Sequence, residues 1–162
     1  MAAHPAGLAI ASEDPRRPDN AALIAALDVA MLALYPKESC HFLSPSQLAS
    51  QGATFLVARL DGVARGCIAL VPDGAGAAEV KRVWTAPEAR GRGLGRALLE
   101  SLVTRARVLG IGALRLETGP LQPEALGLFR SAGFRERGPF RSYTDDPNLI
   151  FMEKILAVES AA

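Results

Sequence analysis

The stretch PEARGRGLG (87–95) constrains the fold more than any other part of this chain. Three glycines stand there at alternate positions among arginines, directly before the leucine-rich segment RALLESLVTRARVLG. Glycine is unfavourable inside a helix because it loses the most backbone freedom on folding. We therefore expect a turn here, between a strand that ends near residue 85 and a helix over about 93–109.

Such a turn suits a phosphate group. The N–H groups in the first turn of a helix have no partner within the helix, and the helix dipole adds positive charge. Glycines let the backbone approach a phosphate closely, and Arg90, Arg92 and Arg96 add formal charge. Two common nucleotide loops do not fit, because the stretch has neither the Gly-Lys of a P-loop nor the third glycine of the dinucleotide fingerprint.

Hydrophobic periodicity predicts the elements around this turn. Apolar residues at helical spacing predict helices, and short β-rich runs bounded by turn residues predict strands. The Asp-Gly at 61–62 favours a hairpin, and we expect Asp19 or Asn20, and Ser44, to cap the first two helices. The order is β-α-α-β-β-β-α-β-α-β-β, an α+β fold with helices on both faces of a mixed sheet. The expected strands are 7–14, 54–60, 66–72, 78–85, 113–119, 134–140 and 148–156, and the expected helices are 21–34, 44–51, 93–109 and 123–133.

Length and charge narrow the class of protein. The 162 residues suit a single domain over 1–162. The net charge of +1, without an aromatic platform beside the arginines, argues against a nucleic-acid partner. No segment reaches the about 18 apolar residues of a membrane span, and the N-terminus lacks the apolar core of a signal peptide. We expect a cytoplasmic protein with no membrane partner, in which Cys40 and Cys67 are free thiols and no metal is bound.

The spacing Arg90-x-x-Gly93-x-Gly95, after Pro87, resembles the acyl-CoA pyrophosphate loop of the GNAT superfamily of N-acetyltransferases. The segment LFRSAGF (128–134) and the order of elements are also similar to that family, so the resemblance covers nearly the whole chain. It implies the GNAT fold, a central sheet of about six or seven strands flanked by about four helices. It also implies acetyl-CoA as the co-substrate.

The resemblance assigns the cofactor site to the turn and to the strand before it. In the family that strand carries a bulge and parts from the next one, and the pantetheine arm enters the split. The N–H of Val83 would polarise the thioester carbonyl by stabilising negative charge on its oxygen. The residues expected to bind the cofactor are Val83, Trp84, Thr85, Arg90, Gly91, Arg92, Gly93, Leu94, Gly95, Arg96, Gln122 and Phe129.

Acetyl transfer to an amine needs a general base, and two carboxylates are candidates. Glu79 is the first, because histone-modifying members of the superfamily have their base at this position relative to Val83. On a regular strand Glu79 shares a face with Lys81 and Val83. Glu117, on the neighbouring strand, is the second candidate. Either carboxylate could instead form only an ion pair.

The general acid is less clear from the sequence. Many family members use a tyrosine in a pattern like L-Y-x-x-x-G-F, and here that position is Phe129, which has no proton to give. Tyr143 is the remaining candidate, and the alternatives are departure of the thiolate without help or a weak enzyme. The expected catalytic residues are therefore Glu79, Tyr143 and Glu117.

Acceptor recognition in the family comes from the first two helices, their loop and the closing hairpin. Here these segments carry polar side chains, and acids among them suit a cationic amine. The expected acceptor-binding residues are Tyr35, Glu38, His41 and Tyr143, with Asp145 and Asp146 nearby.

These observations predict an N-acetyltransferase that moves an acetyl group from acetyl-CoA to a primary amine of a small molecule or peptide. Direct attack in a ternary complex is the expected route. The alternative is a GNAT-fold sensor or regulator that binds acyl-CoA with little transfer. The sequence leaves open whether the protein forms a homodimer.

Overall fold

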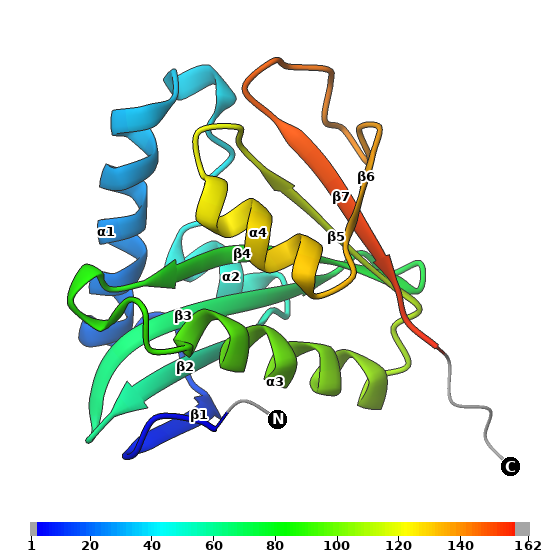
Figure 1. The fold of residues 1–162 in the computed structure, drawn as a ribbon. Helices are drawn as coiled ribbons and strands as arrows, with labels where there is room; N and C mark the ends of the chain where they lie inside the picture. Colours follow the sequence, from blue (N-terminus) through cyan, green and yellow to red (C-terminus); the bar gives the residue numbers. More distant parts are fainter. Residues whose placement is uncertain (1–2, 158–162) are drawn as a thin grey trace, which may run out of the picture.

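The computed structural model describes residues 3–157, and its strands and α-helices follow the predicted order (Figure 1). Two one-turn 3-10 helices, η1 and η2, lie in the loops. The elements are β1 (Leu8–Ser12), α1 (Pro18–Leu34), η1 (Lys37–Ser39), α2 (Pro45–Ser50), β2 (Thr54–Leu60), β3 (Val63–Pro72), β4 (Ala77–Thr85), η2 (Pro87–Ala89), α3 (Leu94–Val108), β5 (Ala113–Thr118), α4 (Pro123–Ser131), β6 (Arg135–Arg137) and β7 (Ile150–Ile155).

The strands form one mixed sheet in the order β1-β2-β3-β4-β5-β7-β6. Every neighbouring pair is antiparallel except β4 and β5, which are parallel because α3 crosses over between them. Seven strands and four α-helices confirm the expected α+β fold.

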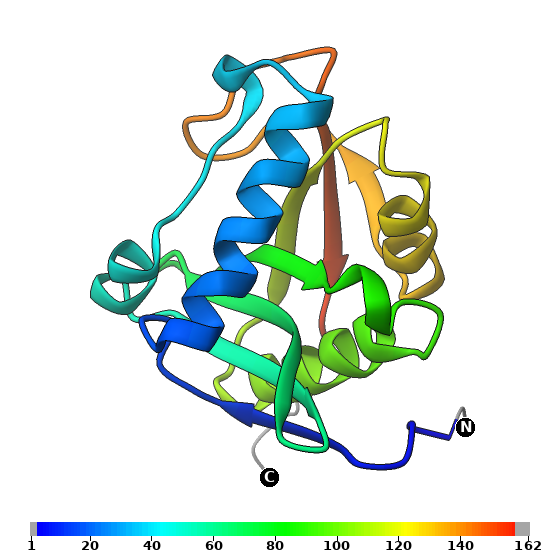
Figure 2. The same cartoon turned by 90° about the vertical axis from the view of Figure 1, so that its left-hand side faces the viewer.

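Helices cover both faces of the sheet (Figures 1 and 2). On one face, Leu23 and Ile24 of α1 and Leu48 of α2 pack with alternate residues of β2 and β3. On the other face, α3 and α4 bury a larger apolar cluster, with Leu98 and Leu102 of α3 completely buried. The two clusters hold the strands between them and fix where the end of β4 lies.

The parallel pairing of β4 with β5 is short. It runs only from Ala77 opposite Ala113 to Glu79 opposite Arg115, after which the strands part. A bulge follows in β4, where the register with β3 shifts and Arg82 takes a φ of 59°. The bulge and the split confirm the features that the family resemblance implied for this strand.

The bulge also corrects one expectation. A regular strand would put Val83 on the same face as Glu79, but Val83 packs against the α3 side of the sheet while Trp84 packs against the α1 side. Arg82 holds the irregular backbone in place, because its guanidinium donates to the Leu43 carbonyl at 2.9 Å and pairs with Asp28. The extra residue therefore turns Val83 away from Glu79.

Several element boundaries differ from the predicted ones. α1 begins at Pro18 rather than 21, because a proline is well placed at a first helical position, and neither Asp19 nor Asn20 is the cap. β3 begins at Val63, since a two-residue turn at 61–62 with positive φ at both positions lets pairing continue to the turn. The predicted strand over 134–140 shortens to Arg135–Arg137. The Ser44 cap of α2 is confirmed, with Gln47 completing a capping box.

Candidate active site

Two cavities meet where β4 and β5 part. The loop groove lies between the glycine-rich turn and the start of α4, and its lining includes Trp84, Thr85, Arg90, Gly91, Gly93 and Gly95. The split pocket lies between β4, β5 and the loop after α1, and its lining includes Tyr35, Cys40, His41, Lys81, Glu117 and Phe129. The two cavities are adjacent, because both are lined by Leu27, Met31, Val83, Gln122 and Ala125.

The glycine-rich turn has the geometry that a phosphate needs. Gly91 and Gly93 have φ angles of 77° and 82°, which favour glycine, and a Cβ on either would meet no atom within 4 Å. Gly93 precedes α3, which begins at Leu94, and its carbonyl accepts the first helical bond from Ala97. The free N–H groups of the first turn therefore lie beside open space, which fits a bound pyrophosphate.

The three arginines of the turn differ in position. The Arg90 guanidinium stacks on the Trp84 ring at 4.8 Å and donates to the Thr85 carbonyl at 3.1 Å, which fixes it beside the loop groove. Arg92 is exposed and lies outside the residues that line the groove. The side chain of Arg96 lines a separate surface groove between α3 and α4 and is not among the residues that line the loop groove.

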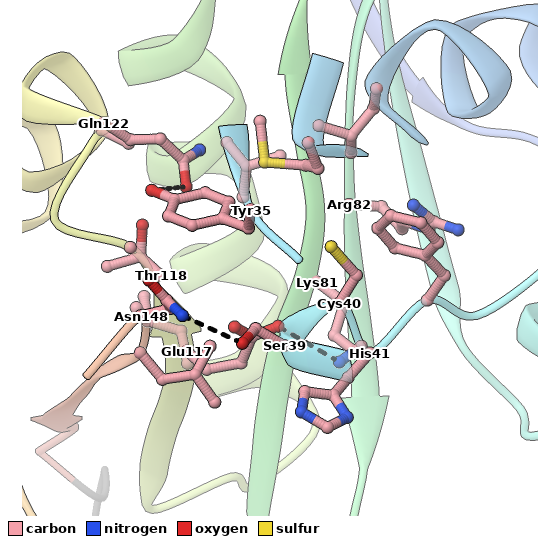
Figure 3. A pocket seen from close by; sticks show the side chains of 18 of the residues that line it. Tyr35, Ser39, Cys40, His41, Lys81, Arg82, Glu117, Thr118, Gln122 and Asn148 are labelled. Carbon is pink, nitrogen blue, oxygen red and sulfur yellow. Dashed lines mark hydrogen bonds and ion pairs between the residues drawn. The ribbon is translucent and has the colours of Figure 1, made fainter. Parts of the chain in front are cut away.

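Glu117 supplies a carboxyl group to the split pocket (Figure 3). Burial raises the pKa of Glu117 to about 7, and the negative charge of Glu79 adds to the rise. The Lys81 ammonium, 3.9 Å from Glu117 Oε1, opposes the rise. A carboxyl group that titrates near neutral pH can both accept and return a proton there.

Glu79 and Tyr143 lie outside the residues that line either cavity. Glu79 is 5% exposed, and its Oε2 accepts from the Tyr143 hydroxyl at 2.6 Å and from Lys81 Nζ at 3.0 Å. Lys81 Nζ also donates to the Tyr143 oxygen at 2.8 Å, and Arg141 lies 3.7 Å from Glu79 Oε1. Burial and the charge of Glu79 raise the pKa of Tyr143. The two residues thus form a closed network around Lys81, and only Lys81 contributes to the pocket.

Tyr35 follows the end of α1, lines the split pocket and lies beside Gln122, which lines both cavities (Figure 3). Its hydroxyl donates to Gln122 Oε1 at 3.3 Å and accepts from the Leu121 N–H at 3.1 Å. A Cβ at position 119 would lie 2.0 Å from this hydroxyl, so the close approach requires Gly119. Phe129, at the position where tyrosine was expected from the resemblance, lines the split pocket but is 3% exposed.

The rim of the split pocket joins two distant loops. Ser39 donates to Asp146 Oδ2 at 2.6 Å and accepts from Asn148 Nδ2 at 3.3 Å. The exposed His41 lines the pocket and packs edge-on against the Tyr143 ring, with the ring centroids 5.1 Å apart. Glu38 is exposed and lies outside the lining residues, so the structure does not place this expected acceptor contact in the pocket.

The sequence did not single out Lys81, Ser39, Gly119 or Asn148 as site residues. The sequence could have indicated Lys81, because it shares a strand face with Glu79 on the strand that leads into the glycine-rich turn. The other three depend on contacts between distant segments. Within residues 3–157, no three His, Cys, Asp or Glu side chains are arranged to hold a metal ion, and no helix is long and apolar enough to cross a membrane.

Comparisons with known proteins agree with this geometry. Residues 8–134 match the acetyltransferase (GNAT) family. An "IAA acetyltransferase" from Azospirillum brasilense is 45% identical over 91% of this chain and 97% of its own. A structure from Klebsiella pneumoniae, assigned as an acyl-CoA N-acyltransferase, is 36% identical with a TM-score of 0.80, covering 93% of this chain and 98% of its own.

A third relative shares the fold at lower identity. The yncA protein of Salmonella typhimurium, an assigned acetyltransferase solved with its cofactor acetyl-CoA, is 22% identical with a TM-score of 0.72. The alignment covers 96% of this chain and 97% of that protein. The family match covers most of the chain, and the split strands and the glycine-rich turn agree with it. The chain is therefore an acyltransferase that belongs to the GNAT acetyltransferase family.

Proposed function

We propose that this protein transfers an acetyl group from acetyl-CoA to the primary amine of a small molecule or peptide. The observation that carries the proposal is the Glu117 carboxyl group, which lines the split pocket next to the loop groove. An amine bound there would lie beside a carboxyl group whose pKa of about 7 suits a general base near neutral pH.

The donor side of the proposal depends on the loop groove. The first-turn N–H groups after Gly93 and the stacked Arg90 guanidinium would hold the pyrophosphate. The end of β4, freed by the split, offers backbone groups to the pantetheine arm at 83–85. Val83 lines both cavities, and its N–H would stabilise the negative charge that develops on the thioester carbonyl.

The acceptor side depends on the split pocket. Glu117 would take the proton from the attacking nitrogen, and Lys81 would limit how far the pKa of that carboxyl rises. Glu79 and Tyr143 orient Lys81 through the hydrogen bonds at 3.0 and 2.8 Å. We therefore propose Glu117 rather than Glu79 as the base, with Glu79 and Tyr143 as positioning residues.

The acceptor itself is a matter for experiment. The panel should contain amino-acid derivatives, polyamines, peptide N-termini and IAA, because the relative that is 45% identical is named for IAA. Release of free thiol from acetyl-CoA is measured with and without each compound. A protein that binds CoA but releases thiol with no compound would be the sensor that the sequence left as an alternative.

The matched variants are Glu117→Gln and Glu136→Gln. Glu136 is exposed and pairs only at the surface with Arg130, so its loss controls for the change of charge. We expect the first variant to lose at least about 100-fold in kcat and to lose the acidic limb near pH 7. An unchanged pH profile in Glu117→Gln would remove Glu117 as the base.

A further inference from the structure

The leaving thiolate of CoA needs a proton, and the usual tyrosine position offers none. Phe129 has only an apolar ring there, buried against Phe134. The chain has two tyrosines, Tyr35 and Tyr143. The Tyr143 hydroxyl is held between Glu79 and Lys81 and lies outside the pocket lining. Tyr35 is therefore the phenol that lines the split pocket.

We propose that Tyr35, from the end of α1, is the general acid that protonates the CoA sulfur. The proposal rests on the acetyl transfer proposed above. Val83 and Gln122 line both cavities, so a donor that extends from the loop groove into the split pocket would pass these two residues. The Tyr35 hydroxyl is hydrogen-bonded to Gln122.

The hydrogen bonds of Tyr35 suit a proton donor. Its O–H points to Gln122 Oε1 at 3.3 Å, which is long for a hydroxyl, so this bond is weak and is readily exchanged for one to sulfur. The Leu121 N–H donates to the phenolic oxygen and would stabilise the tyrosinate that remains. Burial raises the pKa of Tyr35, with the charge of Glu117 adding to the rise, so the hydroxyl stays protonated until it is needed.

The protons balance in this scheme. Glu117 accepts a proton as the acceptor nitrogen bonds to the acetyl carbon, and the carbon–sulfur bond breaks with its electron pair going to sulfur. Tyr35 gives its proton to that sulfur. The protonated Glu117 then returns a proton to Tyr35 through the pocket, so one proton moves from the amine to the thiol overall.

Gly119 leaves the space that the Tyr35 hydroxyl occupies. Because a Cβ at this position would lie 2.0 Å from the Tyr35 oxygen and 2.3 Å from its ring carbon, Gly119→Ala must displace the hydroxyl. Its φ lies outside the left-handed range, so the substitution adds no backbone strain of its own. Gly119→Ala should therefore lower kcat as Tyr35→Phe does, while leaving the phenol present.

The decisive experiment places 3-fluorotyrosine at position 35 of the full chain. Fluorine lowers the pKa of a phenol and keeps its hydrogen bonds, so the alkaline limb of kcat should move to lower pH. The same sample has a second readout, because the ¹⁹F signal should shift when CoA is added and no reaction occurs. A structural tyrosine would leave the alkaline limb unchanged, and that result overturns the proposal.

Substitutions complete the test. Tyr35→Phe should lose about 100-fold in kcat while its Kd for CoA changes less than about threefold, and Glu136→Gln is the matched surface control. A kcat within twofold of the parent in Tyr35→Phe overturns the proposal. If the parent protein transfers acetyl to no amine, the proposed function fails, whereas an absent ¹⁹F shift with saturating CoA contradicts the placement of Tyr35 alone.

Discussion

Replacing Glu117 by glutamine should stabilise the folded protein above about pH 8 although it abolishes transfer. Burial raises the pKa of Glu117 from 4.5 to about 7, so the folded state holds its proton more tightly than the unfolded state. Stability from this group is present below about pH 4 and is lost as the pH rises through about 7. Glutamine keeps the shape and has no charge to desolvate, so it escapes this loss.

The size of the effect follows from the pKa shift. The rise corresponds to about 3 kcal/mol, which already includes the attraction to Lys81, so the variant should gain about 3 kcal/mol at the higher pH. For a chain of this size that is about 6–12 °C in Tm. Thermal unfolding at pH 5 and pH 8.5, at one ionic strength, should show similar Tm values at the lower pH and a higher Tm for Glu117→Gln at the upper.

The control and the refuting result are simple. Glu136→Gln removes a carboxylate from an exposed ion pair, so its Tm should track that of the parent protein at both pH values. A Tm difference between Glu117→Gln and the parent that is the same at pH 5 and pH 8.5 would refute the reasoning, because it would mean that the carboxyl is not destabilised by burial.

Three further predictions concern other parts of the site. Gly93→Ala places a Cβ at a φ of 82° and should lower the free energy of unfolding by about 1–2 kcal/mol. It should also weaken CoA binding measured by calorimetry, and an unchanged CoA affinity would contradict the role of the turn. Lys81→Met removes the nearer of the two cations beside the buried Glu79 and leaves only Arg141, 3.7 Å away, so it should cost about 1.5–3 kcal/mol in urea unfolding. A loss under about 1 kcal/mol would speak against the network. Cys67 is fully buried, which raises its pKa to about 12, so a thiol reagent at pH 8 should label it only after unfolding, as mass spectrometry can check.

The glycine-rich turn was the most predictable part of the site. Its signal is local, because Gly91 and Gly93 need positive φ and a helix must begin directly after them. The order of strands and helices was predictable for the same reason, since each element carries its own periodicity. Ser44 and the Asp-Gly turn at 61–62 likewise act within a few residues.

The choice between the two carboxylates was not predictable from local signals. Glu79 has the family position, yet the structure surrounds it with Lys81, Tyr143 and Arg141 and leaves Glu117 in the pocket. Lys81 comes from β4, whereas Arg141 and Tyr143 come from the loop before β7, and only the folded sheet brings these two segments together. The bulge at 82 also reverses the alternation of side chains, so a count along the strand puts Val83 on the wrong face.

The site of Tyr35 depends on distance along the chain. Tyr35 and Gln122 are 87 residues apart, and their contact needs both the end of α1 and the turn before α4. Gly119 is uninformative as a sequence feature, because its requirement comes from a ring that arrives from another element. The substitution of phenylalanine at 129 was the one sequence signal that an acid had to be sought elsewhere.

The short parallel pairing of β4 with β5 has a mechanical consequence. Only three registered pairs join the half-sheet β1-β2-β3-β4 to the half-sheet β5-β7-β6, fewer than join any of the other strand pairs except β6 and β7. A ligand that lies between β4 and β5 beyond Glu79, where the strands part, would contact both halves of the sheet and link them. Bound CoA should therefore slow amide exchange at 81–85 and 116–118 in step, which makes the co-substrate a structural member of the sheet during each turnover.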